Sequence, residues 1–151
     1  MSERNDEALR ELITFRVGEQ EYGVDITDVR EIRGWTPATP LPKTPGFVRG
    51  VINLRGTVLP IVDMAARMGS DMTDPTVRHV IVVVWIHGQL VGLLVDAVCD
   101  ILPVRPDELQ ATPDLVGEAD AFVEALFSTA ERMVGVLRLP ALLPRSELQA
   151  A

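Results

Sequence analysis

The chain is made of short apolar segments that end at tight-turn residues. One of them, residues 80–86 (VIVVVWI), is a continuous run of mainly β-branched side chains, which is typical of a strand buried on both faces. Similar segments recur on both sides of it and end at turn pairs such as Arg55-Gly56 and His87-Gly88. With 11 glycines and 11 prolines among 151 residues, the sequence excludes a helical bundle. It predicts an all-β protein of small barrels or a sandwich.

The apolar segments pair across their turns. Three β-hairpins are predicted, over residues 12–26, 80–95 and 122–139. Segments 47–54 and 57–62 flank another turn, and Pro60 predicts an edge strand or a bulge there because proline lacks an amide donor.

The intervening segments are predicted to hold loops and short helices. Residues 26–32 fit either a helical turn or an irregular strand, since their apolar side chains lie three apart. Residues 36–45 contain four prolines and predict an extended loop. We expect Asp63 to cap a short helix that ends at Gly69, and Pro140 to begin another.

Charge and cysteine content restrict the possible partners. The net charge of −8 and the pI near 4.7 argue against nucleic acid. The longest apolar run is far shorter than a membrane span of about 20 residues, and Cys99 is the only cysteine, so we expect a soluble, cytoplasmic protein without membrane insertion. Residues 26–55 carry a net +3 and residues 106–130 a net −6. These stretches are either solvated loops or two electrostatic poles for different partners.

Catalytic and metal-binding patterns are not found. His79 and His87 flank the apolar run and would lie about 25 Å apart along an extended strand, too far to share a metal. Asp96, Cys99 and Asp100 offer too few ligands for a hard cation and no base beside the thiol. We expect Asp96 to bind local backbone amides and Cys99 to pack as a small hydrophobe, with no catalytic residue, metal or cofactor.

These observations predict a binding module. Trp35, beside the proline loop, is a candidate exposed anchor for a partner, whereas Trp85 is expected to lie partly in the core. The alternative is a small β-barrel ligand-binding regulator or enzyme that uses Asp63, His79 or Asp96.

Two segments carry a family resemblance. Residues 47–63 (FVRGVINLRGTVLPIVD), preceded by Val29-x-Glu31-Ile32, and residues 91–98 (VGLLVDAV) resemble the CheW-type chemotaxis coupling proteins. The resemblance implies two intertwined five-stranded SH3-like β-barrels with short helices. It places a single domain of two barrel subdomains over residues 11–145, between a flexible N-terminal tail (1–10) and a C-terminal tail (146–151). Residues 135–140 depart from the family pattern, which leaves the end of the second barrel open.

The resemblance also implies a function. The expected protein is a non-catalytic adaptor, recruited to membrane receptor arrays, that couples chemoreceptor cytoplasmic tips to the regulatory domain of a chemotaxis histidine kinase. Flagellar and other pathways both remain open. The positions that match the family's receptor groove are Val29, Glu31, Arg55, Val80 and Ile101.

Structural predictions also follow from the motif turn, which is formed by Asn53, Leu54, Arg55 and Gly56. Because glutamate and arginine are rarely buried unpaired, we expect Glu31 and Arg55 to form an ion pair across the gap between their segments. Gly56 is expected to adopt a positive φ, and Gly50 to allow a close approach of another strand.

Overall fold

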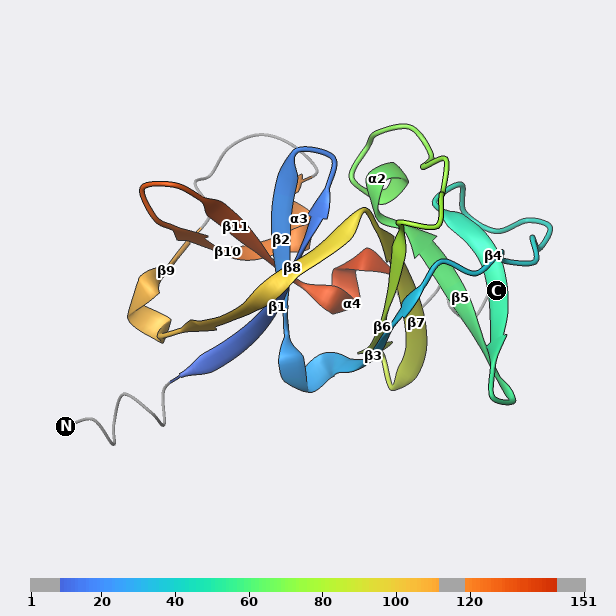
Figure 1. Cartoon of the computed structure of the whole chain (residues 1–151), viewed down its shortest axis with the longest axis horizontal. Helices are drawn as coiled ribbons and strands as arrows, with labels where there is room; N and C mark the ends of the chain where they lie inside the picture. Colours follow the sequence, from blue (N-terminus) through green and yellow to red (C-terminus); the bar gives the residue numbers. More distant parts are fainter. Residues whose placement is uncertain (1–8, 112–118, 144–151) are drawn as a thin grey trace.

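The computed structural model describes residues 9–111 and 119–143, which fold into two β-sheets side by side (Figure 1). The fold is mostly β with a few short helices, as predicted. The proposed C-terminal tail and most of the N-terminal one lie outside the described residues. The short helices are η1 (Ile26–Asp28), α2 (Met64–Arg67), η2 (Pro106–Glu108), α3 (Ala119–Phe122) and α4 (Leu139–Leu142).

The five-stranded sheet has the strand order β3-β6-β7-β5-β4. Its strands are β3 (Val29–Gly34), β4 (Val48–Leu54), β5 (Thr57–Asp63), β6 (Val80–Ile86) and β7 (Gln89–Val95). Strands β5 and β7 pair in parallel, whereas the other neighbours are antiparallel. The barrel does not close, because the edge strands β3 and β4 are not hydrogen-bonded neighbours.

The six-stranded sheet has the order β8-β1-β2-β11-β10-β9. Its strands are β1 (Arg10–Val17), β2 (Gln20–Asp25), β8 (Ala97–Val104), the two-residue β9 (Leu109–Gln110), β10 (Val123–Ser128) and β11 (Met133–Leu137). The parallel pair β2 and β11 joins the two ends of the chain within this sheet. The chain therefore forms β1 and β2 of the six-stranded sheet first, then all strands of the five-stranded sheet, and then β8 to β11 of the six-stranded sheet. This order explains the predicted intertwining.

Three apolar clusters form the core of the part of the chain that the structure describes. One lies within the five-stranded sheet around Ile81 and Val83, and one within the six-stranded sheet around Leu12 and Val134. The largest joins both sheets and the helix α4, and its members include Phe15, Val24, Val82, Val84 and Leu142. Because β6 supplies residues alternately to two of these clusters, it is buried on both faces, as its β-branched composition predicts.

The uncertain segment 26–32 contains both predicted structures, because the 3-10 turn η1 runs directly into β3. Pro60 lies inside β5, which is not an edge strand. However, β5 pairs with β7 only from Ile61 onward, so the missing amide donor of Pro60 interrupts no pairing with β7. Gly50 has a φ of +142°, and a Cβ there would lie 2.2 Å from the carbonyl oxygen of Thr39. The predicted close approach at Gly50 is confirmed.

The environments expected for three side chains are wrong. Trp85 is exposed (42%), whereas Trp35 is half-buried against the cluster of the five-stranded sheet, with the Arg49 guanidinium 5.4 Å from its ring centre. Cys99 is exposed and not packed in the core. It lies in β8 where the register with β1 shifts, because Asp100 pairs with Thr14 and Val98 with Phe15.

Candidate functional site

The motif turn is a two-residue hairpin loop between β4 and β5. Both loop residues have positive φ, +50° at Arg55 and +90° at Gly56, as in a type I′ turn. The Asn53 side-chain oxygen accepts a hydrogen bond of 2.9 Å from the amide of Gly56, while Leu54 is buried. The buried Leu54 and the hydrogen bond of Asn53 thus hold the turn in one conformation, and Arg55 points outward from it.

Glu31 and Arg55 form the predicted ion pair. A guanidinium nitrogen of Arg55 (Nη2) donates to Oε1 of Glu31, and Nη1 of Arg33 lies 3.5 Å from the other carboxylate oxygen. The pair connects β3 to the β4–β5 turn, and so spans the open side of the five-stranded sheet. The hydrogen bond from Arg55 has the largest effect on the pKa of Glu31 and lowers it. Desolvation raises this pKa by a smaller amount, and the charges of both arginines lower it further.

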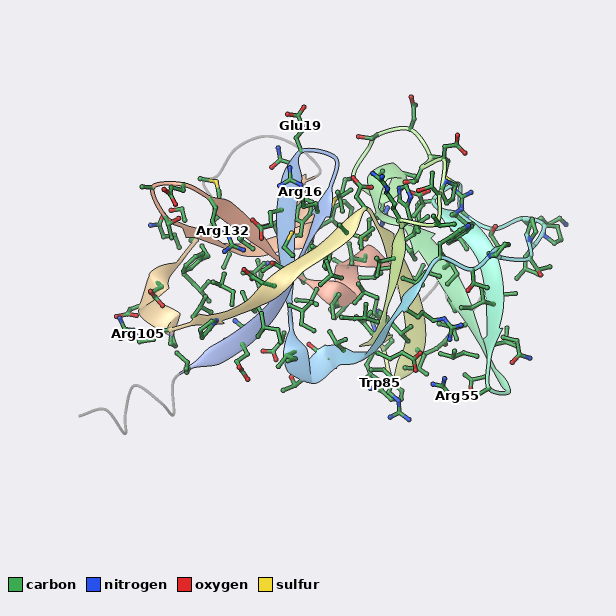
Figure 2. The ribbon with its side chains drawn as sticks, viewed as in Figure 1. Arg16, Glu19, Arg55, Trp85, Arg105 and Arg132 are labelled. Atoms are coloured by element: carbon green, nitrogen blue, oxygen red, sulfur yellow. The ribbon has the colours of Figure 1, made fainter. Side chains whose placement is uncertain are left out.

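Trp85 belongs to the same end of the sheet, as Figure 2 shows for Trp85 and Arg55. Glu31 pairs with Val83, so Trp85, two residues further along β6, is its diagonal neighbour on the same face. The site therefore contains an exposed indole and an exposed guanidinium at the same end of the sheet. Sequence reasoning missed Trp85; the available signal was its place one residue before the end of the strand, close to the His87-Gly88 turn.

The other predicted groove residues are not gathered around this pair. Val29 pairs with Val84, whereas Val80 is opposite Gly34 at the other end of the same two strands. Both side chains are half-buried against the cluster that joins the sheets. Ile101 lies on β8 of the other sheet and is 54% exposed. The structure brings together Glu31 and Arg55, with Val29 two residues from Glu31 on the same strand, and leaves Val80 and Ile101 apart from them.

Asp63, a candidate of the enzyme alternative, is fully buried and hydrogen-bonded. It caps α2 through the amide of Ala66, as predicted, and accepts from both the amide and the hydroxyl of Thr73. Nη1 of Arg49 lies 2.9 Å from its Oδ2 and completes the set of partners. This carboxylate attaches the loop after α2 to the sheet and is not available to a substrate.

His79 and Asp96 form a link between the two sheets. Nδ1 of His79 accepts from the amide of Thr76 at 2.9 Å, and Nε2 lies 3.5 Å from Oδ1 of Asp96. The other oxygen of Asp96 accepts from the amide of Gly18 at 2.8 Å. The expectation that Asp96 binds local amides is therefore wrong, because Gly18 lies 78 residues away in the other sheet.

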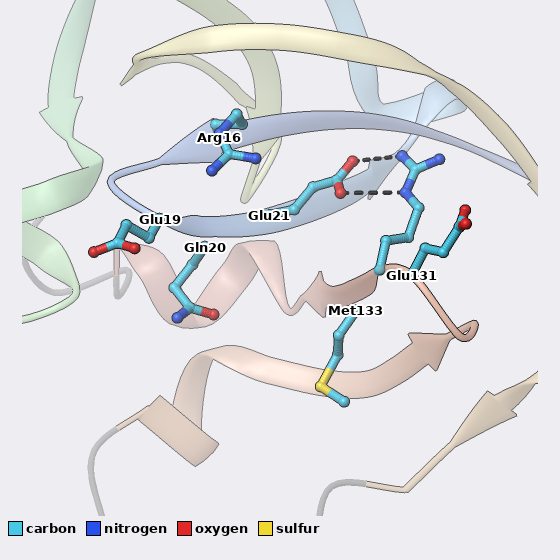
Figure 3. A pocket seen from close by; sticks show the side chains of 7 residues that line it. Arg16, Glu19, Gln20, Glu21, Glu131 and Met133 are labelled. Atoms are coloured by element: carbon cyan, nitrogen blue, oxygen red, sulfur yellow. Dashed lines mark hydrogen bonds and ion pairs between the residues drawn. The ribbon is translucent and has the colours of Figure 1, made fainter.

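A polar pocket of about 250 Å³ lies on the six-stranded sheet (Figure 3). It is lined by charged and polar side chains with one methionine: Arg16, Glu19, Gln20, Glu21, Glu131, Arg132 and Met133. Arg132 is already engaged by Glu21, Asp100 and Thr14. Apolar walls with a few convergent polar groups are typical of ligand sites, and this pocket has the opposite composition.

Over residues 9–111 and 119–143, no three His, Cys, Asp or Glu side chains are grouped so that they could hold a metal ion. In the same part of the chain, no helix has the length and apolar character needed to cross a bilayer. Among the described residues, the features that face solvent include an ion pair, an indole and open strand edges. The fold and the site thus define a protein-interaction domain built on two small β-sheets.

Comparison with known proteins gives the family. The CheW-like domain matches residues 11–147. The chain is 52% identical to the chemotaxis protein CheW of Rhizobium meliloti (strain 1021), over 94% of this chain and 92% of that protein. It is 50% identical, with the same coverage, to the probable chemotaxis protein CheW of Rhizobium etli. The crystal structure of the scaffolding protein TtCheW from Thermoanaerobacter tengcongensis superposes with a TM-score of 0.84, at 33% identity over 91% of this chain and 94% of that one.

The chain belongs to the CheW family, whose members are non-catalytic scaffold proteins of chemotaxis. The resemblance of the two sequence segments is confirmed. The enzyme alternative is wrong, and its three candidate residues hold the fold together instead.

Proposed function

We propose that this protein couples the cytoplasmic tips of chemoreceptors to the regulatory domain of a chemotaxis histidine kinase. The observation that carries the proposal is that a CheW-like domain occupies residues 11–147, nearly the whole sequence. The protein works at membrane receptor arrays, to which its partners recruit it. A scaffold of this kind acts by geometry, and many modest interfaces combine into a stable assembly.

The receptor surface includes Glu31 and Arg55, with Val29, Val80 and Ile101 as apolar members. The Arg55 side chain is 69% exposed, so its guanidinium can contact a partner while it remains paired with Glu31. A receptor tip is a helical hairpin, whose apolar stripe fits a surface of half-buried aliphatic side chains flanked by polar groups. Because Ile101 belongs to the other sheet, the surface extends over both sheets.

The test is a pair of titrations, one against a soluble receptor-tip fragment and one against the kinase regulatory domain. We expect the unmodified protein to bind both, and Arg55→Ala to weaken receptor binding about tenfold while kinase binding is unchanged, since exposed arginines are frequent anchors of interfaces. The matched control is Arg105→Ala, because Arg105 is also exposed and faces a carboxylate, Asp107, at 3.8 Å in the other half of the molecule.

Each outcome has a defined meaning. If the unmodified protein binds neither partner, the coupling function is wrong. If Arg55→Ala weakens kinase binding instead, the ion pair belongs to the kinase contact and the receptor surface lies elsewhere. Equal losses in Arg55→Ala and Arg105→Ala would show that only general electrostatic attraction is measured.

A further inference from the structure

We propose that Trp85 is the apolar anchor of the receptor surface at the Glu31–Arg55 end of the five-stranded sheet. Its occupant is a receptor-tip helix that presents an apolar and an acidic side chain on one face. The inference rests on the proposed function and adds the residue that determines which partner fits.

Trp85 is exposed within a strand whose neighbouring residues are buried. Residues 81–84 of β6 are fully buried and Ile86 is 1% exposed, yet the indole of Trp85 is 42% exposed. Tryptophan has the largest apolar surface of any side chain and is enriched among the residues that dominate interface energetics. An indole left in water at the end of a rigid strand is free to be covered by a partner.

Trp85 has an apolar neighbour on one strand and a charged neighbour on the other. Leu90, directly opposite Trp85 on β7, is half-buried and packs against the apolar cluster of the five-stranded sheet. Glu31 is the diagonal neighbour on β3 and holds Arg55. The indole thus lies between an apolar floor and a charged rim, which is the composition of an interface centre with its polar edge.

The segments that form this end of the five-stranded sheet are positively charged. Strand β3 and the β4–β5 turn carry Arg30, Arg33 and Arg55 against Glu31, a net +2, although the whole chain has a net charge of −8. A partner surface that carries carboxylates is attracted to this end of the molecule and repelled from the rest. A carboxylate can take the donors of Arg55 that Glu31 leaves unused, while an apolar side chain covers Trp85.

The experiment uses Trp85 as its own reporter. The sequence has two tryptophans, so a Trp35→Phe variant leaves Trp85 as the single indole. We expect a soluble receptor-tip fragment to shift its emission to shorter wavelength and to protect it from acrylamide quenching. In the otherwise unmodified chain, Trp85→Ala is expected to weaken receptor binding by calorimetry at least tenfold. Met133→Ala is the matched control and should bind normally, because Met133 is an exposed apolar residue of the other sheet (59%, against 42% for Trp85).

The outcomes separate this inference from the coupling function. Receptor binding without an emission change, and with normal affinity of Trp85→Ala, overturns the anchor and leaves the coupling function intact. An emission change caused by the kinase regulatory domain, or by raising the concentration of this protein alone, assigns the surface to that partner and overturns the inference. Absence of binding to both partners overturns the inference and the coupling function together.

Discussion

At the scale of single residues, carboxylates and arginines from distant segments hold the loops to the sheets. Arg49 reaches the buried Asp63, and Arg132, from the turn between β10 and β11, reaches Glu21 with Nε at 3.2 Å from Oε1. Burial raises the pKa of Glu21, but hydrogen bonds from Arg132 and Thr14 outweigh it, so the pKa lies below its usual value. A buried carboxylate without such donors would destabilise the fold.

This pair predicts a pH dependence of stability. The pKa of Glu21 is lower in the folded than in the unfolded protein, so its contribution is complete above the unfolded value and is lost as the pH falls through the folded value. We expect Glu21→Gln to cost about 1 kcal/mol of unfolding free energy at pH 7. In urea titrations the difference should shrink steadily below about pH 4, near the ordinary glutamate pKa.

The control is Glu19→Gln, an exposed residue of the neighbouring turn, which should behave like the unmodified protein. A difference between Glu21→Gln and the unmodified protein that stays constant from pH 7 to pH 3 would contradict an ionic origin.

At the scale of elements, Arg67 joins helices that belong to different halves of the chain. Its guanidinium carbon lies 4.1 Å from the ring centre of Phe47 and 4.5 Å from that of Phe122. Nε donates to the carbonyl of Leu142 at 2.7 Å, and Nη2 to that of Ala141 at 3.3 Å. The terminal carbonyls of α4 thereby obtain donors that the helix itself cannot supply. One side chain from α2 thus fixes α4 and α3 against the five-stranded sheet.

Replacement of this arginine tests the arrangement. Arg67→Lys keeps the charge but loses the planar group between two rings and the forked donors, so we expect a loss of about 1–2 kcal/mol of unfolding free energy. Thermal unfolding measures the effect, with Arg78→Lys in the exposed loop before β6 as the control. Equal melting temperatures for Arg67→Lys and the unmodified protein would show that charge alone matters at this position.

At the scale of the whole molecule, the two sheets share their largest apolar cluster. Phe15 and Val24 come from the six-stranded sheet, whereas Val82 and Val84 come from the five-stranded sheet. Neither half can bury these side chains alone. The path of the chain adds to this dependence. The N-terminal hairpin pairs with β8 and β11, and all strands of the other sheet lie between this hairpin and β8 in the sequence.

The shared core predicts a single unfolding transition. Both tryptophans report on the five-stranded sheet, since Trp85 lies in β6 and Trp35 directly follows β3. We expect Phe15→Leu, in the other sheet, to lower the midpoints of tryptophan fluorescence and of far-UV circular dichroism equally, at a cost of about 1 kcal/mol. Two separate transitions, or a shift in only one signal, would mean that the sheets unfold independently.

Local chemistry accounts for what could be predicted. Turn pairs such as Arg55-Gly56 and His87-Gly88 determine hairpins through positive φ, and both residues of each pair adopt it here. The Asp63 cap is also local, because its helix begins at the next residue. The Glu31–Arg55 pair spans 24 residues and was predictable only because an unpaired charge at a partly buried site is unfavourable.

The strands, their tight turns, the cap of α2 and the family can be predicted from the sequence, since each depends on residues close together in the chain. The parallel pairs β5–β7 and β2–β11, the link from Asp96 to Gly18 and the exposure of Trp85 depend on how distant segments pack together. Exposure depends on what lies opposite a side chain in space, and no periodicity within one strand contains that information. For this reason the candidate anchor is Trp85 and not Trp35, which the sequence favoured.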